Sequence, residues 1–299
     1  MTSRSLPLTH ALLAIATVAI WGTNFPIMKV ATEQMPPLLI AALRFLFVLF
    51  PAIFVFKRPK VPWRLMAAYG LLIGVGQFGL IYIAVSGYIS PGLASLVIQT
   101  QVFFTIILAI LITRERVQPY QWAGLALATI GVVVIGLHTG GDTTIAGLVM
   151  VLVAALSWAG GNIASKASGR VNMIAYVVWT SIFSMPILFV LAFVFEGWDL
   201  ISTSIVTADA ATWGAVLWQS FGNTLFGYAC WSWLLSRHPA ATVVPMALLV
   251  PVFGMGASTI WLGESLPAWK LAAGALVMSG LAISMLWPRL RPQQAGAAS

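Results

Sequence analysis

Ten apolar stretches of about 20 residues alternate with short polar segments that contain Pro, Gly or charged side chains. They lie at residues 8–28, 36–56, 65–85, 91–112, 120–138, 146–165, 173–195, 211–235, 240–262 and 268–287. A helix of roughly 20 apolar residues crosses the hydrocarbon core of a bilayer. The pattern therefore predicts an all-α membrane protein with ten transmembrane helices, and the only long connection between them is 196–210.

Composition supports the same class. Hydrophobic residues make up 60% of the chain and charged residues 7%, whereas soluble domains have about 25% charged residues. The first stretch has no small-residue cleavage site after it, so we interpret it as a retained helix and not as a signal peptide. Cys230 is the single cysteine, which excludes an intrachain disulfide.

The distribution of cations predicts how the chain sits in the membrane. Ten spans place both termini on one side, and the loops of that side carry Arg4, Lys57, Arg58, Lys60, Arg64, Arg114, Arg116, Lys166, Arg170, Arg237, Arg289 and Arg291. The other side has only Lys29 and Lys270. The positive-inside rule then predicts cytoplasmic termini in a bacterial-type inner membrane. The net charge of +8 follows from these loops and does not indicate a nucleic-acid partner.

The two halves of the chain resemble each other. "WGTNFPIMK" at 21–29 parallels "WAGGNIASK" at 158–166, Glu115 aligns with Glu264, and Gly131 aligns with Gly280. We predict a first five-helix repeat at 1–141, a second at 142–290 and a tail at 291–299. Five is an odd number, so the second repeat enters the membrane inverted, which is a transporter architecture suited to alternating access. The alternative is a duplication whose halves later took unrelated roles.

Several motifs carry a resemblance to a known family. They are "IWGTNFPIMK" at 20–29, "ALRF" at 42–45, "GLASLVIQTQVFFTI" at 92–106, "SWAGGN" at 157–162 and "LGESLPAWKLAAGALVMSG" at 262–280. With these motifs the chain resembles the drug/metabolite transporter superfamily, of the two-repeat EamA type, over nearly its whole length. It is most similar to exporters of cysteine, O-acetylserine and related amino acids.

The resemblance implies an exporter of amino acids and related small metabolites, with outward direction and broad selectivity. The alternative within the same superfamily is a drug or nucleoside-type solute exporter. A receptor or scaffold is the alternative from another class, but only one loop is long enough to offer a partner surface. We expect an amino-acid substrate, surrounding membrane lipids and a monomer as the working unit.

Polar side chains inside apolar spans are the candidate substrate-binding residues, because an amide that faces lipid is costly. The alternative for each is a hydrogen bond between packed helices. The candidates are Asn24, Gln77, Tyr82, Gln101, Trp158, Asn162, Gln219, Asn223 and Tyr228. Gln99 and Gln101 lie about 200° apart on a regular helix, so we expect only one of them to face a cavity. We expect the cavity to be lined mainly by spans one, three, four, six, eight and nine, and glycine-rich spans five and ten to pack closely.

Arg44 is the one cation placed within a span. It either binds a substrate carboxylate or has a structural role, paired with Glu33 or with helix carbonyls. Glu115 and Glu264 each precede a helix start, where a carboxylate is favoured by free N–H groups, so we expect gating or structural roles for them. The same roles are expected for Pro26, Pro245 and Pro251, which interrupt helix hydrogen bonding.

The chain lacks the residues that other mechanisms need. All seven acidic residues and all three histidines lie in loops or near span ends. A proton-coupled carrier usually needs a buried acid or His within a span, so obligatory proton coupling is not expected. No His, Cys, Asp and Glu cluster has metal-ligand or acid–base spacing, so we expect no enzyme, no metal and no cofactor.

Overall fold

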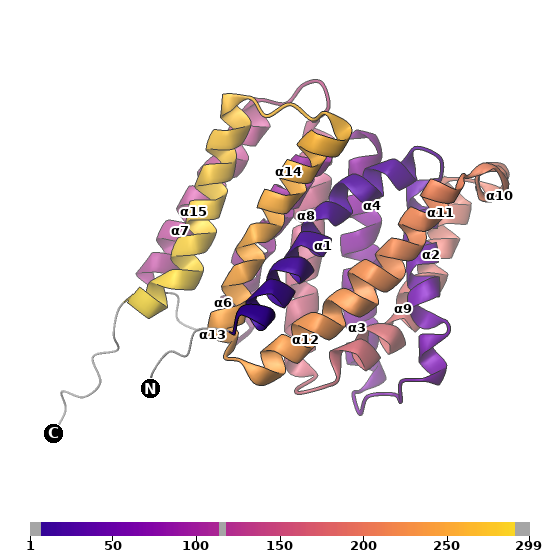
Figure 1. The fold of residues 1–299 in the computed structure, drawn as a ribbon, viewed down its shortest axis with the longest axis horizontal. Helices are drawn as coiled ribbons and strands as arrows, with labels where there is room; N and C mark the ends of the chain where they lie inside the picture. Colours follow the sequence, from indigo (N-terminus) through magenta and orange to yellow (C-terminus); the bar gives the residue numbers. More distant parts are fainter. Residues whose placement is uncertain (1–6, 114–117, 291–299) are drawn as a thin grey trace.

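The structure is a computed structural model that describes residues 7–113 and 118–290 of the 299-residue chain (Figure 1). This part of the chain consists of helices and connecting loops, with no strand. The helical segments of the first half are α1 (Leu8–Thr32), α2 (Pro37–Leu49), η1 (Ala52–Phe54), α3 (Trp63–Gly70), η2 (Leu71–Gly79), α4 (Leu80–Gly87), α5 (Pro91–Val97), η3 (Ile98–Thr100), α6 (Gln101–Thr113) and α7 (Pro119–Leu137).

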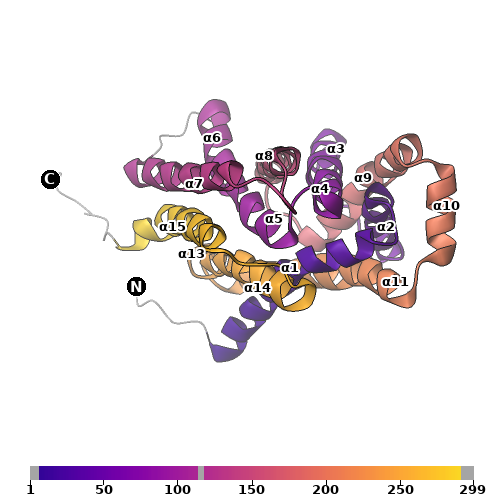
Figure 2. The ribbon, with the colours of Figure 1, turned by 90° about the horizontal axis from the view of Figure 1, so that it is seen from above.

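The second half repeats this order, with a longer helix where the first half has η1. Its segments are α8 (Ile145–Ala167), α9 (Met173–Phe195), α10 (Trp198–Thr207), α11 (Ala210–Leu217), η4 (Trp218–Phe226), α12 (Gly227–Arg237), α13 (Ala240–Val243), η5 (Val244–Leu249), α14 (Val250–Leu262) and α15 (Ala268–Leu290). This longer helix is α10, which occupies most of the long connection 196–210 and lies at one edge of the bundle in Figure 2.

Within the described residues, nine helical stretches are long and apolar enough to cross a membrane. A tenth candidate is the pair Trp198–Thr207 and Ala210–Arg237, which meet at 104°. The second member of that pair coincides with the expected span at 211–235. The all-α membrane fold predicted from the apolar pattern is therefore confirmed.

Irregular helix occurs at matching places in the two halves. Segment η2 interrupts the third span and η4 interrupts the eighth, and each is a nine-residue π-helical stretch. Segments η3 and η5 are 3-10 helix in the fourth and ninth spans. The members of each pair are five spans apart along the chain. Because five is an odd number, the chain passes through the two equivalent segments in opposite directions. π-helical stretches are uncommon and often mark functional sites.

The fifth and tenth spans, α7 and α15, pack side by side in both ribbon views (Figures 1 and 2). A Cβ atom built on Gly280 would lie 2.4 Å from the backbone oxygen of Gly124, and one on Gly124 would lie 2.5 Å from the oxygen of Gly280. Glycine at both positions is what permits this approach. The close packing expected for these two spans is confirmed.

The remaining helices of the two halves interleave. Helix α1 packs on α14, α2 packs on α9, and α8 packs on η2 and α6. Buried apolar residues fill the space between them in one large cluster that draws on both halves. A cavity is left where the irregular segments meet.

Candidate functional site

The cavity has a volume of about 360 Å³ and is bordered by both halves of the chain. Seven of the predicted residues lie on it: Asn24, Gln77, Gln101, Trp158, Asn162, Asn223 and Tyr228. They come from α1, η2, α6, α8, η4 and α12. Because they are brought together from six segments, the cavity walls combine amides with aromatic rings.

Two amides on the wall have an unpaired carbonyl oxygen. Asn24 is 4% exposed and Gln77 is 6% exposed. Asn24 donates from Nδ2 to the Met28 sulfur at 3.2 Å, but no donor of the described residues reaches Asn24 Oδ1 or Gln77 Oε1. Buried polar atoms usually have partners, and four others of the described residues also lack one: Arg44 Nη1, Gln219 Nε2, Ser258 Oγ and Ser284 Oγ.

The side chain of Asn223 is fixed by a hydrogen bond from the buried guanidinium of Arg44, which lies behind the cavity wall. Arg44 is fully buried and donates from Nη2 to Asn223 Oδ1 at 2.7 Å and to Thr224 Oγ1 at 2.8 Å. Its guanidinium lies 4.0 Å from the centre of the Phe78 ring. The expected pairing of Arg44 with Glu33 or helix carbonyls is wrong, and Arg44 itself is not among the lining residues. It acts as a positioning residue for Asn223.

Two other amides of the lining are paired with each other. Asn162 Nδ2 donates to Gln101 Oε1 at 2.9 Å and to Thr105 Oγ1 at 3.3 Å. Gln99 donates to the Ala247 carbonyl at 3.3 Å and also lines the cavity. The expectation that only one of Gln99 and Gln101 faces a cavity is therefore wrong. The 200° separation applies to a regular helix, whereas Gln99 belongs to the 3-10 segment η3 and Gln101 is the first residue of α6.

Other expectations about the lining are corrected too. Tyr82 and Gln219 do not line the cavity, because the Tyr82 hydroxyl and the Gln219 side chain bond to each other in the packed interior. Leu281 of α15 also lines it, in addition to residues of the six spans expected to form most of the lining. Tyr69, Trp231 and Ser165 also belong to the lining and were not predicted; their only sequence signal is a polar or aromatic side chain within an apolar span.

The cavity reaches toward the side of the molecule on which the termini lie. Its lining includes Ser165 near the end of α8, Met173 at the start of α9 and Met285 near the end of α15. At the other end of the bundle, buried apolar residues such as Val85, Ile89 and Leu93 pack together. Packed side chains thus separate this cavity from the side opposite the termini.

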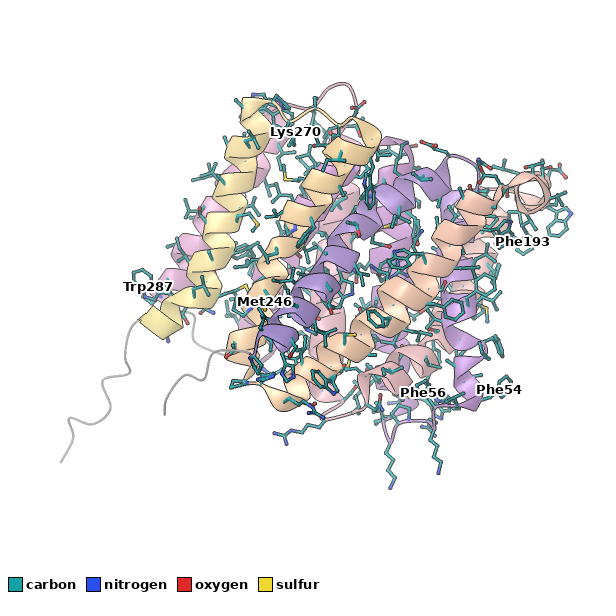
Figure 3. The ribbon with its side chains drawn as sticks, viewed as in Figure 1. Phe54, Phe56, Phe193, Met246, Lys270 and Trp287 are labelled. Atoms are coloured by element: carbon teal, nitrogen blue, oxygen red, sulfur yellow. The ribbon has the colours of Figure 1, made fainter. Side chains whose placement is uncertain are left out.

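A buried ion pair lies at the end of the bundle opposite the termini. Glu264 accepts from Lys270 Nζ at 3.0 Å, from the Gly92 backbone N–H at 2.9 Å and from the Ser90 hydroxyl. It connects the loop between α14 and α15 to the start of α5, and Figure 3 shows Lys270 at the end of the bundle opposite the termini. We call Glu264, Lys270, Ser90 and Gly92 the outer clip. Its pseudo-equivalent Glu115 lies outside the described residues, as does the tail 291–299.

The three prolines all lie within helical segments. Pro26 is inside α1, Pro245 is in the 3-10 segment η5, and Pro251 is in the first turn of α14. None of them lines the cavity. Their expected part in gating stays a prediction.

The cavity walls carry no formal charge. Among the described lining residues there is no Asp, Glu, His, Lys or Arg, and the described part of the chain holds no group of three His, Cys, Asp or Glu side chains placed to bind a metal. Amides, hydroxyls and indoles can hold a polar solute by hydrogen bonds and ring contacts. The arrangement is that of a binding cavity for a small solute.

A family model matches the chain twice, at residues 8–137 and 145–286, and its description is "EamA-like transporter family". The chain belongs to the EamA-like transporter family. The resemblance seen in the motifs is therefore confirmed. The two EamA matches fall within the predicted repeats, whose boundary near 141 stays a prediction.

Two bacterial relatives cover nearly the whole EamA-like chain. One from Salmonella typhimurium is 42% identical over 93% of this chain and 95% of its own, and one from Escherichia coli is 39% identical over the same shares. Each is called a "Probable amino-acid metabolite efflux pump". A crystal structure at 20% identity covers 98% of this chain and 100% of its own with a TM-score of 0.63, which shows a shared fold.

Proposed function

We propose that the protein is an inner-membrane exporter of amino acids and related small metabolites, with broad selectivity and no obligatory proton coupling. The observation that carries the proposal is the cavity of amides, hydroxyls and aromatic rings, whose described lining holds no charged side chain. The names of the two bacterial relatives support the substrate class and the outward direction.

Broad selectivity follows from the kind of interaction that the cavity offers. A neutral hydrogen bond contributes about 0.5–1.5 kcal/mol net, and 1.4 kcal/mol corresponds to tenfold in affinity. Two related substrates should therefore differ in affinity by about tenfold for each hydrogen bond that one of them forms and the other does not. No ion pair to a substrate side chain is available to impose a stricter choice.

In an alternating-access transport cycle, the described conformation would be the inward-facing state. With both termini cytoplasmic, the cavity faces the cytoplasm and the outer clip closes the periplasmic side. Glu115 is the pseudo-equivalent of Glu264 and would close the cytoplasmic side in the opposite state. The halves 1–141 and 142–290 would move against each other in a monomer surrounded by lipid, without a chemical reaction.

The test is uptake of labelled amino acids by proteoliposomes that contain the purified protein, with and without a pH gradient. A panel of neutral amino acids is compared with aromatic cations and nucleosides. We expect several amino acids to be taken up at similar rates, and the rates to persist when the pH gradient is collapsed.

Two results would contradict the proposal. Uptake that disappears with the pH gradient would reveal a proton-coupling group, with Glu33 and His10 as the first residues to examine. A protein that moves aromatic cations or nucleosides but no amino acid would establish the drug or nucleoside-type alternative.

A further inference from the structure

The inference concerns the surface where the chain turns between its second and third spans. The second span ends at Phe54 and the third begins at Trp63. Four exposed cations lie between these two ends or directly beside them: Lys57, Arg58, Lys60 and Arg64. We call these four residues the basic segment. Because a span ends where the hydrocarbon core meets the headgroups, the basic segment lies at the level of the lipid headgroups.

Large apolar side chains are exposed next to the basic segment. Phe54 is 81% exposed, Val55 73% and Trp63 47%. Figure 3 shows Phe54 and Phe56 at the end of the bundle away from Lys270. Segments that bind a membrane surface combine apolar side chains, which enter the boundary of the acyl chains, with cations that stay among the headgroups. Residues 54–64 present both kinds of side chain at one place.

Contacts with α9 hold this surface in a defined position. Trp179 of α9 donates from Nε1 to the Phe56 carbonyl at 2.8 Å. The Trp63 ring lies 6.4 Å from the Trp179 ring and 5.9 Å from the Phe183 ring, measured between ring centres. The connection between α2 and α3 is therefore attached to a helix of the other half, and its cations are presented from a packed support.

Arg58 is placed to bind an anionic group. Its guanidinium lies 4.0 Å from the centre of the Trp63 ring, and its Nη2 donates to the Val61 carbonyl at 3.1 Å. No other hydrogen bond of this side chain is formed within the described residues, so Nε and Nη1 are available to a ligand. The planar fork of a guanidinium matches the oxygens of a phosphate group.

The positive charge of the basic segment is not neutralised by neighbouring acids. The sequence from 34 to 114 contains no Asp or Glu. Helix α3 packs on α8 and α9, and these two helices contain no acidic residue either. None of the four cations forms an ion pair in the part of the chain that the structure describes. The surface is complementary to a ligand with net negative charge.

We propose that the basic segment, together with Phe54, Val55 and Trp63, is a binding surface for phospholipids whose headgroup carries a net negative charge. The phosphate lies among the cations, and an acyl chain lies beside the apolar side chains. A role in orienting the chain in the membrane requires the cations alone; it requires neither the exposed rings nor the Arg58–Trp63 contact. The inference names a class of lipid and does not depend on the transported solute.

The test compares an anionic lipid with a zwitterionic one. The purified full-length protein in neutral detergent is mixed with equal amounts of phosphatidylglycerol and phosphatidylcholine that have the same acyl chains, and native mass spectrometry counts the lipids retained. A basic residue near an anionic surface contributes about fivefold in affinity. We therefore expect phosphatidylglycerol to be retained at least about tenfold more than phosphatidylcholine. Equal retention by the wild-type protein would overturn the inference.

Substitutions then assign the preference to this surface. The combined variant Lys57→Gln, Lys60→Gln and Arg64→Gln should bring the ratio of the two lipids down toward one. The matched control removes three positive charges from other positions expected on the same side, with Arg237→Gln, Arg289→Gln and Arg291→Gln. It should keep the wild-type ratio. An equal fall in both variants would show that net charge, and not the basic segment, selects the lipid.

Two measurements on the wild-type protein complete the test and do not depend on whether a variant folds. Raising the concentration of ammonium acetate from 0.1 to 1 M shortens the screening length from about 10 to about 3 Å, so the preference for phosphatidylglycerol should fall. A preference that ignores salt would contradict recognition by charge. Excess glycerol 3-phosphate, which has the phosphate but no acyl chain, should not displace the lipid. Displacement would assign the surface to a soluble phosphate compound and overturn the lipid assignment.

Discussion

Arg44 is a charge held inside the bundle by neutral partners. Nε and Nη2 both donate to Thr224 Oγ1, at 3.1 and 2.8 Å, and Nη2 also donates to Asn223 Oδ1. A guanidinium presents its donors as a planar fork, whereas an ammonium group is a compact point charge on a flexible stem. The position therefore depends on the shape of the head group as well as on its charge.

Replacing Arg44 with Lys should destabilise the protein by on the order of 2 kcal/mol, because hydrogen bonds to a charged group are lost while a charge stays buried. Thermal unfolding of the purified protein in detergent measures the effect. Thr224→Val, which removes the acceptor shared by Nε and Nη2, should lower the midpoint in the same direction. Unchanged midpoints in both variants would contradict this role.

Asp209 provides a pH-dependent cap at the start of α11. Hydrogen bonds from the Thr212 backbone N–H and the Gln34 amide lower the pKa of this carboxyl from its ordinary value of 3.8. A lowered folded pKa means that the cap stabilises the protein above the unfolded pKa and is lost as pH falls through the folded one. The relevant window is therefore below 3.8.

Hydrogen exchange at the first turn of α11 should accelerate in the wild-type protein when the pH falls below about 3.8, after correction for the intrinsic pH dependence of exchange. Asp209→Asn keeps the shape of the side chain and removes its titration. The variant should exchange at a corrected rate that does not change across this window. The same acceleration in both proteins would show that another group controls the start of α11.

At the scale of elements, the contact between α7 and α15 is set by glycine. A methyl group on Gly280 would meet backbone atoms of Gly124 and Ala128 at 2.4 and 3.1 Å. Backbone atoms in the middle of a helix cannot move away singly, so the two helices would have to separate. Each helix comes from a different half, and the contact joins the halves.

Gly280→Ala should therefore destabilise the protein by about 1–3 kcal/mol, the usual effect of overpacking a close contact. Gly256→Ala is the matched control, since a methyl group at this position of α14 meets nothing within 4 Å. It should be neutral or slightly stabilising because alanine favours helix. Thermal unfolding compares them, and equal effects would show that the close contact does not matter for stability.

The outer clip is an element-level contact with a consequence for conformation. Glu264 and Lys270 are 8% and 5% exposed, and the removal of one charge leaves the other buried and unpaired. Because the clip attaches the α14–α15 loop to the start of α5, its loss should favour opening on that side. The residue equivalent to Glu264 in the first half is Glu115, which lies outside the described residues.

Glu264→Gln should make the side opposite the termini more accessible. The measurement is thiol labelling of a cysteine placed at Val85, which is buried on that side, in a protein whose own Cys230 is replaced by serine. We expect labelling to accelerate about tenfold, equivalent to a shift of 1.4 kcal/mol between two states. Asp199→Asn, an exposed acid on the same side, is the control and should leave labelling unchanged.

The fold could be predicted from the sequence because each membrane-spanning helix must be apolar and each loop between two such helices is polar. Sequence reasoning found most cavity amides for a related reason: a polar side chain in a lipid-spanning segment must face inward. It could not separate a cavity from a packed interface, so Gln219 was placed with Asn223. It also could not find the partners of Arg44, because Thr224 is 180 residues away and carries no charge.

At the scale of the whole molecule, the uncharged cavity predicts how transport responds to pH. Without a described acidic, basic or histidine side chain on its walls, the exchange of a zwitterionic amino acid should proceed at a nearly constant rate between about pH 6 and 8, the range in which histidine would titrate. Counterflow at equal pH on both sides measures this. A bell-shaped or sigmoidal profile would reveal a titrating group in the cycle.

The same uncharged cavity also makes transport independent of the membrane potential. A single charge that crosses the membrane gains or loses about 2.3 kcal/mol for each 100 mV, but a zwitterion in a neutral cavity carries no net charge in either direction. The membrane voltage would then neither drive export nor oppose the return of the empty cavity. The concentration ratio of the solute would alone decide the direction of flow, and transport would generate no current in a planar bilayer.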